Sequence, residues 1–191
     1  MNSKDDDDDD DKECTQVQRL DNCIYFYDEI TRKSVLKLMI LLKQATTDVQ
    51  KQQFISGGTG IIYLHICSYG GSVFHGLAAM DVVRSNPVPV TTVIEGIVCS
   101  AATFMALGGK QVTMRESAHV LIHQIRSCFW GKYEEFNDEK ETLDKMMNVL
   151  RKMYTTHTKI PDEILKDMFK RDIYIDFESC QKWCVIDSVY E

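Results

Sequence analysis

Apolar residues in the middle of the chain form short runs that alternate with stretches of helical spacing. The run IIYLHIC at residues 61–67 is nearly all apolar, as in a strand buried on both faces of a sheet, and VTTVIEG at residues 90–96 predicts a second buried strand. Between them, residues 72–85 repeat apolar positions with the period of a helix, bounded by a Gly-Gly pair and an Asn-Pro-Val-Pro segment. Strands that alternate with helices in this order predict an α/β fold with parallel βαβ units.

The same alternation continues toward both ends of the chain. No segment repeats with a fixed period and no linker interrupts the pattern, so we expect one domain over residues 21–191 after a tail over residues 1–20. The longest predicted helix is charged and amphipathic. Further strands are expected at residues 23–27, 111–115, 119–124, 173–176 and 185–189, and further helices at residues 31–53, 100–107, 133–157 and 161–169.

Charge is concentrated at the N-terminus. Residues 1–13 contain seven Asp, one Glu and two Lys, while the whole chain has a net charge of −7. Like charges in a row repel and cannot pack, so we expect residues 1–20 to be a disordered acidic tail. The rest of the chain is nearly neutral, which argues against a nucleic-acid-binding protein.

The seven cysteines are scattered, without a CxxC pair or zinc-finger spacing, which is typical of reduced thiols in a reducing compartment. The sequence has no run of ~18 apolar residues, so we expect no membrane-spanning helix. The N-terminus has neither a signal-peptide core nor the acid-poor composition of a transit peptide. We therefore expect a cytoplasmic protein with no nucleic-acid partner and no membrane partner.

Polar residues that could share one chemistry lie at the ends of several predicted strands. Ligands of α/β folds bind beyond the carboxyl ends of the strands. Ser100 follows the second buried strand, His123 follows a later short strand, and Asp172 directly precedes another. A serine hydroxyl becomes a good nucleophile when an imidazole takes its proton, and a carboxylate orients that imidazole and stabilises its cation. These side chains therefore predict a Ser-His-Asp site.

Backbone N–H groups near Ser100 could stabilise the oxyanion of an acyl transfer. The Ala101 N–H lies at a predicted helix N-terminus, and the pair Gly70-Gly71 would let a second backbone segment approach a substrate closely. Each feature also has an ordinary interpretation, with the serine as a helix N-cap and the glycine pair as a turn. Cys99 competes with Ser100 for the role of nucleophile, and their spacing leaves both open.

Several motifs resemble those of the ClpP family, the serine peptidase subunits of the Clp protease, in order and at similar spacing. The family segment SPGGSV corresponds here to CSYGGSV, the segment around the family's nucleophile to GIVCSAATF, and MIHQP to LIHQI. The family's Arg-Asp pair corresponds to Arg171-Asp172, and its C-terminal segment to CQKWCVIDSV. The resemblance extends from about Cys23 to Val189.

The resemblance implies a role for each candidate residue. It makes Ser100, rather than Cys99, the nucleophile, with His123 as the general base and Asp172 as the carboxylate that orients the base. The oxyanion hole implied by the resemblance consists of the backbone N–H groups of Gly71 and Ala101, with Gly70 as an adjacent candidate.

The resemblance also implies a fold and an assembly. The fold would be the ClpP/crotonase-like α/β fold, with the helix at residues 133–157 as a protruding handle. Two heptameric rings of this chain would stack into a tetradecamer that encloses the active sites. A hexameric AAA+ unfoldase of the ClpX or ClpA kind would use ATP to thread unfolded proteins inside, where the serine endopeptidase would cleave them. The subunit itself would need no cofactor and no metal.

The chain departs from the family pattern at several positions. Tyr69 replaces the proline before Gly-Gly, and Ile125 replaces the proline after His-Gln. Phe129 and Trp130 are bulky in a strand that is usually glycine-rich and lies at the ring–ring contact in the family. Lys170 stands where relatives often have an acidic residue that pairs across rings.

Two expectations about assembly follow. Ring–ring pairing would use other charges, such as Glu134 or Glu135. Residues 14–22 would form the axial gate, with the aspartate run at the pore, where tails of like charge would repel one another.

Three other functions fit parts of the sequence. A non-catalytic ring subunit would share the family and the fold, although such subunits have lost triad residues that are present here. An acyl-CoA enzyme of the crotonase type would share the fold and a two-amide oxyanion hole, and would use acidic residues rather than a Ser-His pair. A phage-type head maturation protease would share the chemistry without the unfoldase.

Overall fold

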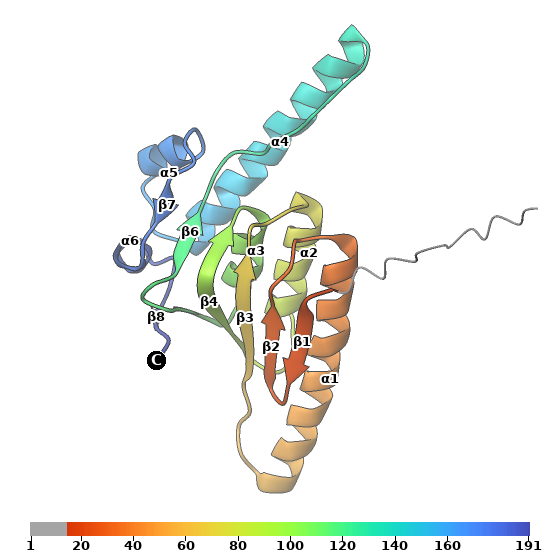
Figure 1. Ribbon diagram of the computed structural model, residues 1–191, viewed down its shortest axis with the longest axis vertical. Coiled ribbons are helices and arrows are strands. Elements are labelled where there is room, and N and C mark those ends of the chain that lie inside the picture. Colours follow the sequence, from red (N-terminus) through yellow and green to blue (C-terminus); the bar gives the residue numbers. More distant parts are fainter. Residues whose placement is uncertain (1–14) are drawn as a thin grey trace, which may run out of the picture.

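A mixed sheet forms the centre of the molecule (Figure 1). The structure is a computed structural model that describes residues 15–191, so the predicted tail over residues 1–14 lies outside the described residues. The eight strands of this sheet follow the order β1-β2-β3-β4-β5-β8, with β6 paired to β4 and β7 paired to β6. They are β1 (Val17–Leu20), β2 (Cys23–Phe26), β3 (Ile62–Ser68), β4 (Val90–Cys99), β5 (Gln111–Met114), β6 (His119–Leu121), β7 (Tyr174–Ile175) and β8 (Ser188–Val189).

Most strand pairs are parallel, and only β1–β2 and β6–β7 are antiparallel in the part of the chain described. Parallel neighbours need a crossover, and α2 supplies it between β3 and β4. The predicted α/β fold with parallel βαβ units is thereby confirmed. The helices are α1 (Arg32–Ser56), α2 (Val73–Arg84), α3 (Ala101–Leu107), α4 (Tyr133–His157), α5 (Asp162–Met168) and α6 (Phe177–Lys182).

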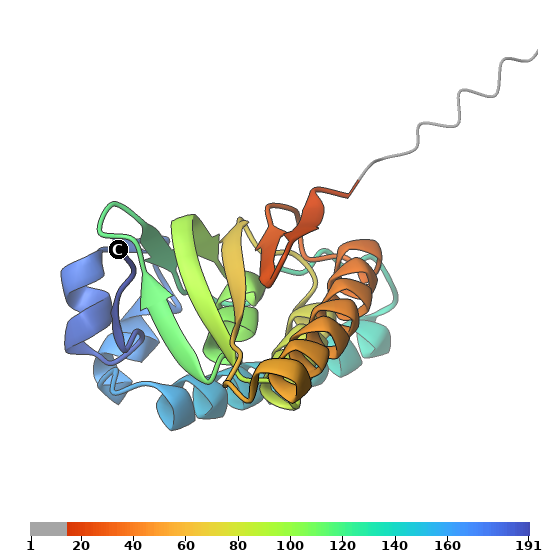
Figure 2. The same cartoon turned by 90° about the horizontal axis from the view of Figure 1, so that it is seen from below.

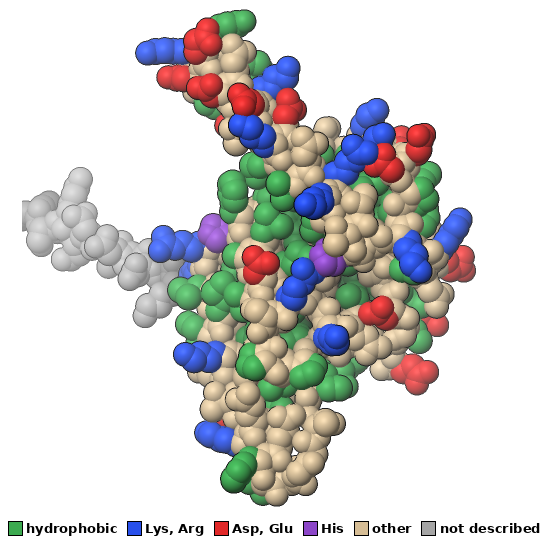
Figure 3. Space-filling view, turned by 180° about the vertical axis from the view of Figure 1, so that it is seen from behind, with side chains coloured by type: hydrophobic (Ala, Val, Ile, Leu, Met, Phe, Trp, Pro, Cys, Tyr) green, Lys and Arg blue, Asp and Glu red, His purple; other side chains and the backbone are tan. Residues whose placement is uncertain are grey.

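One helix projects from the body. In Figure 1, α4 extends beyond the sheet as an arm, and Figure 3 shows acidic and basic side chains mixed along it. Figure 2 shows the orange α1 and the cyan α4 on the same side of the strands. The handle predicted at residues 133–157 is therefore present with the same bounds. No helix in residues 15–191 combines the length and the apolar character that a bilayer crossing needs.

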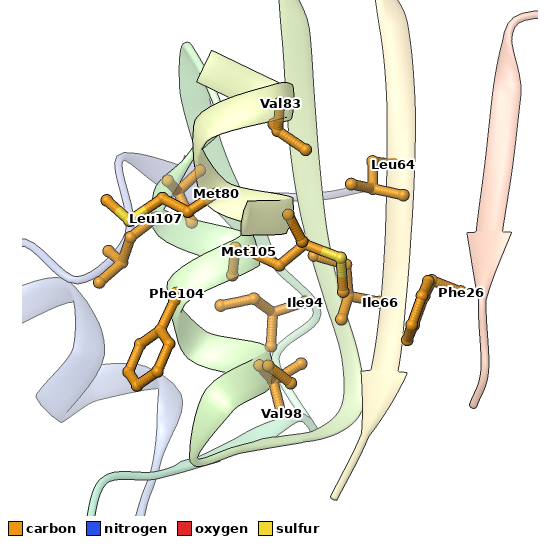
Figure 4. Close-up of a cluster of buried hydrophobic side chains, with 14 of the residues drawn as sticks. Phe26, Leu64, Ile66, Met80, Val83, Ile94, Val98, Phe104, Met105 and Leu107 are labelled. Atoms are coloured by element: carbon orange, nitrogen blue, oxygen red, sulfur yellow. The ribbon is translucent and has the colours of Figure 1, made fainter. Parts of the chain in front are cut away.

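The hydrophobic core lies between the sheet and the helices α2 and α3 (Figure 4). Full burial of one such side chain stabilises the fold by about 1.5–3 kcal/mol. Gly76 lets α2 approach α3 closely, because a Cβ at this position would lie 2.7 Å from the Ala101 carbonyl oxygen. The core side chains labelled in Figure 4 include Leu64, Ile66, Met80, Ile94, Val98, Phe104 and Met105.

The N-terminal boundary of the domain differs from the prediction. The expected disordered tail over residues 1–20 is wrong for residues 17–20, which form β1. This strand pairs with β2 through a two-residue turn, in which Asp21 has a φ of 53°. Val17 anchors the strand because its side chain is buried in the core. The ordered domain therefore begins before residue 21.

Two predicted strand ends also differ. β4 continues past the predicted end at residue 96 to Cys99, because Gly96 takes a φ of 57° and lets the strand bend. β6 ends at Leu121, so His123 lies beyond the observed strand, although the strand predicted at residues 119–124 included it. Ser100 and His123 therefore both lie outside the regular helices and strands.

Candidate active site

A pocket with a volume of about 710 Å³ lies at the carboxyl ends of β3, β4 and β6. This is the position expected for a ligand site in an α/β fold. Ser100 and His123 both line it, and Asp172 is not among the lining residues. The other polar or flexible residues of its wall include Ser68, Tyr69, Gly70, Gly71, Gln124, Arg126 and Tyr154.

Ser100 occupies a strained turn between β4 and α3. Its backbone has φ 53° and ψ −126°, a conformation that costs a non-glycine residue about 1–3 kcal/mol. The Ser100 N–H donates to the Leu121 carbonyl at 2.8 Å, and the Thr103 N–H and hydroxyl donate to the Ser100 carbonyl at 2.9 and 2.6 Å. The side chain makes no capping hydrogen bond to α3, so the N-cap interpretation does not hold. Among the described residues, no partner occupies its hydroxyl, and Ser100 lines the pocket.

Cys99 has a different environment. Its side chain is buried and does not line the pocket. Burial raises the pKa of the Cys99 thiol to about 11, so the thiol stays protonated near neutral pH. The nucleophilic form of cysteine is the thiolate, and this environment disfavours it.

The register of β6 and β7 brings His123 and Asp172 face to face. These strands pair antiparallel, with Leu121 opposite Tyr174. The same antiparallel register, extended to two residues after Leu121 and two residues before Tyr174, puts His123 opposite Asp172. The Gln124 N–H donates to the Phe169 carbonyl at 3.1 Å, which ties the segment after β6 to the end of α5. Two segments far apart in the sequence are thereby held together at the pocket.

The distance between the His123 and Asp172 side chains is too long for a hydrogen bond. His123 Nδ1 lies 3.8 Å from Asp172 Oδ1, and this nitrogen is buried without a partner in the described chain. Burial lowers the pKa of His123, the Asp172 carboxylate raises it, and the Arg126 guanidinium lowers it. The net shift is downward, which favours the neutral imidazole that a general base requires.

The backbone at the glycine pair approaches the Ser100 turn closely. Gly70 has a φ of 97°, and a Cβ there would lie 2.9 Å from Ser100 Cβ and 3.2 Å from the Ala101 nitrogen. The Gly70 N–H is engaged, because it donates to Ser68 Oγ at 3.2 Å. By contrast, the N–H groups of Gly71 and Ala101 donate no hydrogen bond within residues 15–191. Two free donors therefore lie beside Ser100, and Gly70 supplies close packing rather than a donor.

Two residues of the site were not among the sequence-based candidates. Arg126 pairs with Asp172, and Tyr154 lines the pocket from α4 while sharing a 2.6 Å hydrogen bond with Thr103. The only sequence signal that could have identified Arg126 was its position, three residues after His123. Tyr154 lies on the buried side of a long amphipathic helix, and its position in the apolar pattern of that helix is typical of a core residue rather than of a site residue. No group of three His, Cys, Asp or Glu side chains suited to a metal ion occurs in the residues described.

Comparison with known proteins agrees with this architecture. The ATP-dependent Clp protease proteolytic subunit of Epifagus virginiana is 30% identical over 164 residues, which cover 80% of this chain and 83% of that protein. The chloroplastic ATP-dependent Clp protease proteolytic subunit 1 of Arabidopsis thaliana is 29% identical over 164 residues, covering 80% and 83% of the two chains. The fold resembles that of a mutant ClpP1 from Listeria monocytogenes, with a TM-score of 0.74, 20% identity and coverage of 89% and 91%. The Clp protease family model matches residues 15–191, so the chain belongs to the Clp protease family.

Proposed function

We propose that this chain is a serine endopeptidase subunit that cleaves unfolded polypeptides. The observation that carries the proposal is the strained Ser100 turn, whose hydroxyl has no hydrogen-bond partner in the described part of the chain and which lines a pocket together with His123. In this mechanism, Ser100 Oγ attacks the scissile carbonyl and His123 accepts the serine proton, then returns it to the leaving amine. Asp172 orients the imidazole and stabilises its cation.

The backbone N–H groups of Gly71 and Ala101 stabilise the oxyanion of the tetrahedral intermediate in this proposal. Both donors are free in the described chain, and Ala101 opens α3, where the helix dipole favours negative charge. Loss of one such donor typically costs about 3 kcal/mol of transition-state stabilisation. Gly70 is the weaker of the predicted donors, because its N–H is already bonded to Ser68.

The proposed working form is a tetradecamer of two heptameric rings in the cytoplasm, fed by an AAA+ unfoldase of the ClpX or ClpA kind. The unfoldase consumes ATP, and the peptidase subunit needs no cofactor. Family membership and the projecting α4 support the ring stack. Trp130, which precedes α4, is 99% exposed in the single chain. In the proposed assembly, a neighbouring subunit would bury this side chain. The other large apolar side chains exposed nearby are Phe129, Tyr133 and Phe136.

Hydrolysis of a short fluorogenic peptide tests the proposal, with the assembly of each variant checked by sizing. Wild type and Cys99→Ala should cleave the peptide, whereas Ser100→Ala should be inactive and still assembled. Activity that survives in Ser100→Ala and disappears in Cys99→Ala would reverse the assignment of the nucleophile.

A non-catalytic ring subunit is the second candidate, and one observation favours it. The 3.8 Å separation of His123 and Asp172 leaves the triad incomplete. An assembled wild type that stays inactive, even with an unfoldase and ATP, would support this role. An unfoldase that restores cleavage would instead support the peptidase.

A further inference from the structure

Asp172 is divided between two partners. Its Oδ1 lies 3.8 Å from His123 Nδ1, while its Oδ2 forms an ion pair with the Arg126 guanidinium. The imidazole nitrogen is buried and has no hydrogen-bond partner within residues 15–191. A buried polar atom without a partner is destabilising. The carboxylate that could satisfy His123 is held by Arg126 instead.

The contact between Arg126 and Asp172 is exposed and therefore easily broken. The Arg126 side chain is 74% exposed and that of Asp172 is 53% exposed. Exposed ion pairs shift an equilibrium by no more than about fivefold. The carboxylate of Asp172 can bind either Arg126 or His123, and these two arrangements are thus close in free energy. Removal of the Arg126 charge is therefore enough to change which arrangement predominates.

Few charged groups act on His123. Burial lowers its pKa, Asp172 raises it, and Arg126 lowers it. Arg171, the neighbour of Asp172, is paired with Asp167 at 3.2 Å. The remaining ionisable side chains that line the pocket are Tyr27, Asp28, Glu29, Cys67, Tyr69 and Tyr154.

We propose that Arg126 is a positioning residue that controls the triad by holding Asp172 away from His123. When the ion pair opens, Asp172 accepts a hydrogen bond from the His123 Nδ1–H. That bond fixes the tautomer whose Nε2 takes the serine proton. This inference rests on the proposed peptidase function, since it assigns a control to the same triad.

The pH profile of kcat/KM for a fluorogenic peptide tests the proposal in Arg126→Gln. The plateau near about pH 8 should rise about two- to fivefold, the factor available from one exposed ion pair. The acidic limb should move to higher pH, because a bonded carboxylate stabilises the imidazolium and a positive neighbour has been removed. A merely structural role of Arg126 would leave the limb in place.

Two controls bracket this result. Arg126→Lys keeps the charge and should behave like wild type. Arg19→Gln removes an arginine of a different ion pair, with Asp48 at 2.8 Å and away from the pocket, and should leave the profile unchanged. An unchanged or lower plateau in Arg126→Gln, a fixed limb, or equal shifts in the controls would overturn the proposal.

A second measurement separates this inference from the proposed function. NMR titration of ¹³C-labelled histidine in the Ser100→Ala background reports the His123 pKa without any turnover. Arg126→Gln should raise that pKa, and Asp172→Asn should abolish the difference. If the pKa rises but wild type never cleaves peptides, the proposed function fails and the control by Arg126 stands. If wild type cleaves and the pKa does not move, the control by Arg126 is wrong.

Discussion

The contact between Gly70 and the Ser100 turn is so tight that one added methyl group should inactivate the enzyme. In Gly70→Ala, the new Cβ would lie 2.7 Å from the Cys99 carbonyl oxygen, 2.9 Å from Ser100 Cβ and 3.2 Å from the Ala101 nitrogen. Two of these three atoms belong to the backbone and cannot rotate away. The turn that carries the hydroxyl and the Ala101 N–H must therefore shift.

The size of the effect follows from what the shift disturbs. A non-glycine residue at the Gly70 φ of 97° costs about 1–3 kcal/mol of stability. Misplacing one oxyanion donor reduces kcat by about 100- to 1000-fold. We therefore expect kcat/KM of Gly70→Ala to fall by at least about 100-fold, with only a modest loss of thermal stability.

Gly57→Ala is the matched control. Gly57 also has a positive φ, 69°, at the C-terminal end of α1, but a Cβ there would meet no atom within 4 Å. This variant should lose stability and keep its peptidase activity. Activity on a fluorogenic peptide and thermal unfolding are measured for both variants. If Gly70→Ala keeps the activity of Gly57→Ala, the close approach of Gly70 to Ser100 is irrelevant to catalysis.

Three further predictions concern the base, the core and the assembly. Burial outweighs the effect of Asp172 and lowers the pKa of His123. As the pH is lowered, kcat/KM should therefore fall only at a pH below the pKa of an ordinary histidine. A fall in kcat/KM at higher pH would contradict this. Leu64→Ala empties a fully buried site in β3 and should lower the free energy of unfolding in urea by about 2–5 kcal/mol, whereas a near-zero change would show that the core collapses around it. Trp130→Ser removes a 99% exposed side chain before α4. If the proposed double ring forms through this surface, the variant should sediment as single rings, and an unchanged profile would place the ring contact elsewhere.

The buried strands and long helices were predictable from periodicity. β3 is a continuous apolar run because both faces of the strand are buried, and α4 is amphipathic because only one face of the helix is buried. Both patterns are visible in the sequence. β1 was missed because it has four residues, only one of them buried, beside a run of like charges. The Asp21-Asn22 pair between two short segments was the available hairpin signal.

The candidate residues of the site were also accessible from the sequence, but their pairing was not. Ser100, His123 and Asp172 follow from residue type and position relative to strands. The antiparallel register of β6 and β7 depends on a strand of two residues, which leaves no periodic pattern to detect. The contact of Arg126 with Asp172 depends on side-chain conformation in an exposed loop, which no spacing rule specifies.

The direction of the backbone gives the adjacent serine and cysteine different environments. Cys99 is the last residue of β4, where its side chain is buried. At Ser100 the chain leaves the strand through a φ of 53°, its N–H fixed to Leu121 and its carbonyl fixed by Thr103. Backbone strain of this kind persists only where the surroundings over-determine it. Both backbone polar groups of Ser100 are bonded, whereas its hydroxyl has no hydrogen-bond partner within residues 15–191. The hydrogen bonds at this turn therefore fix the backbone, while Ser100 lines the pocket, and this arrangement supports the proposal that Ser100 rather than Cys99 is the nucleophile.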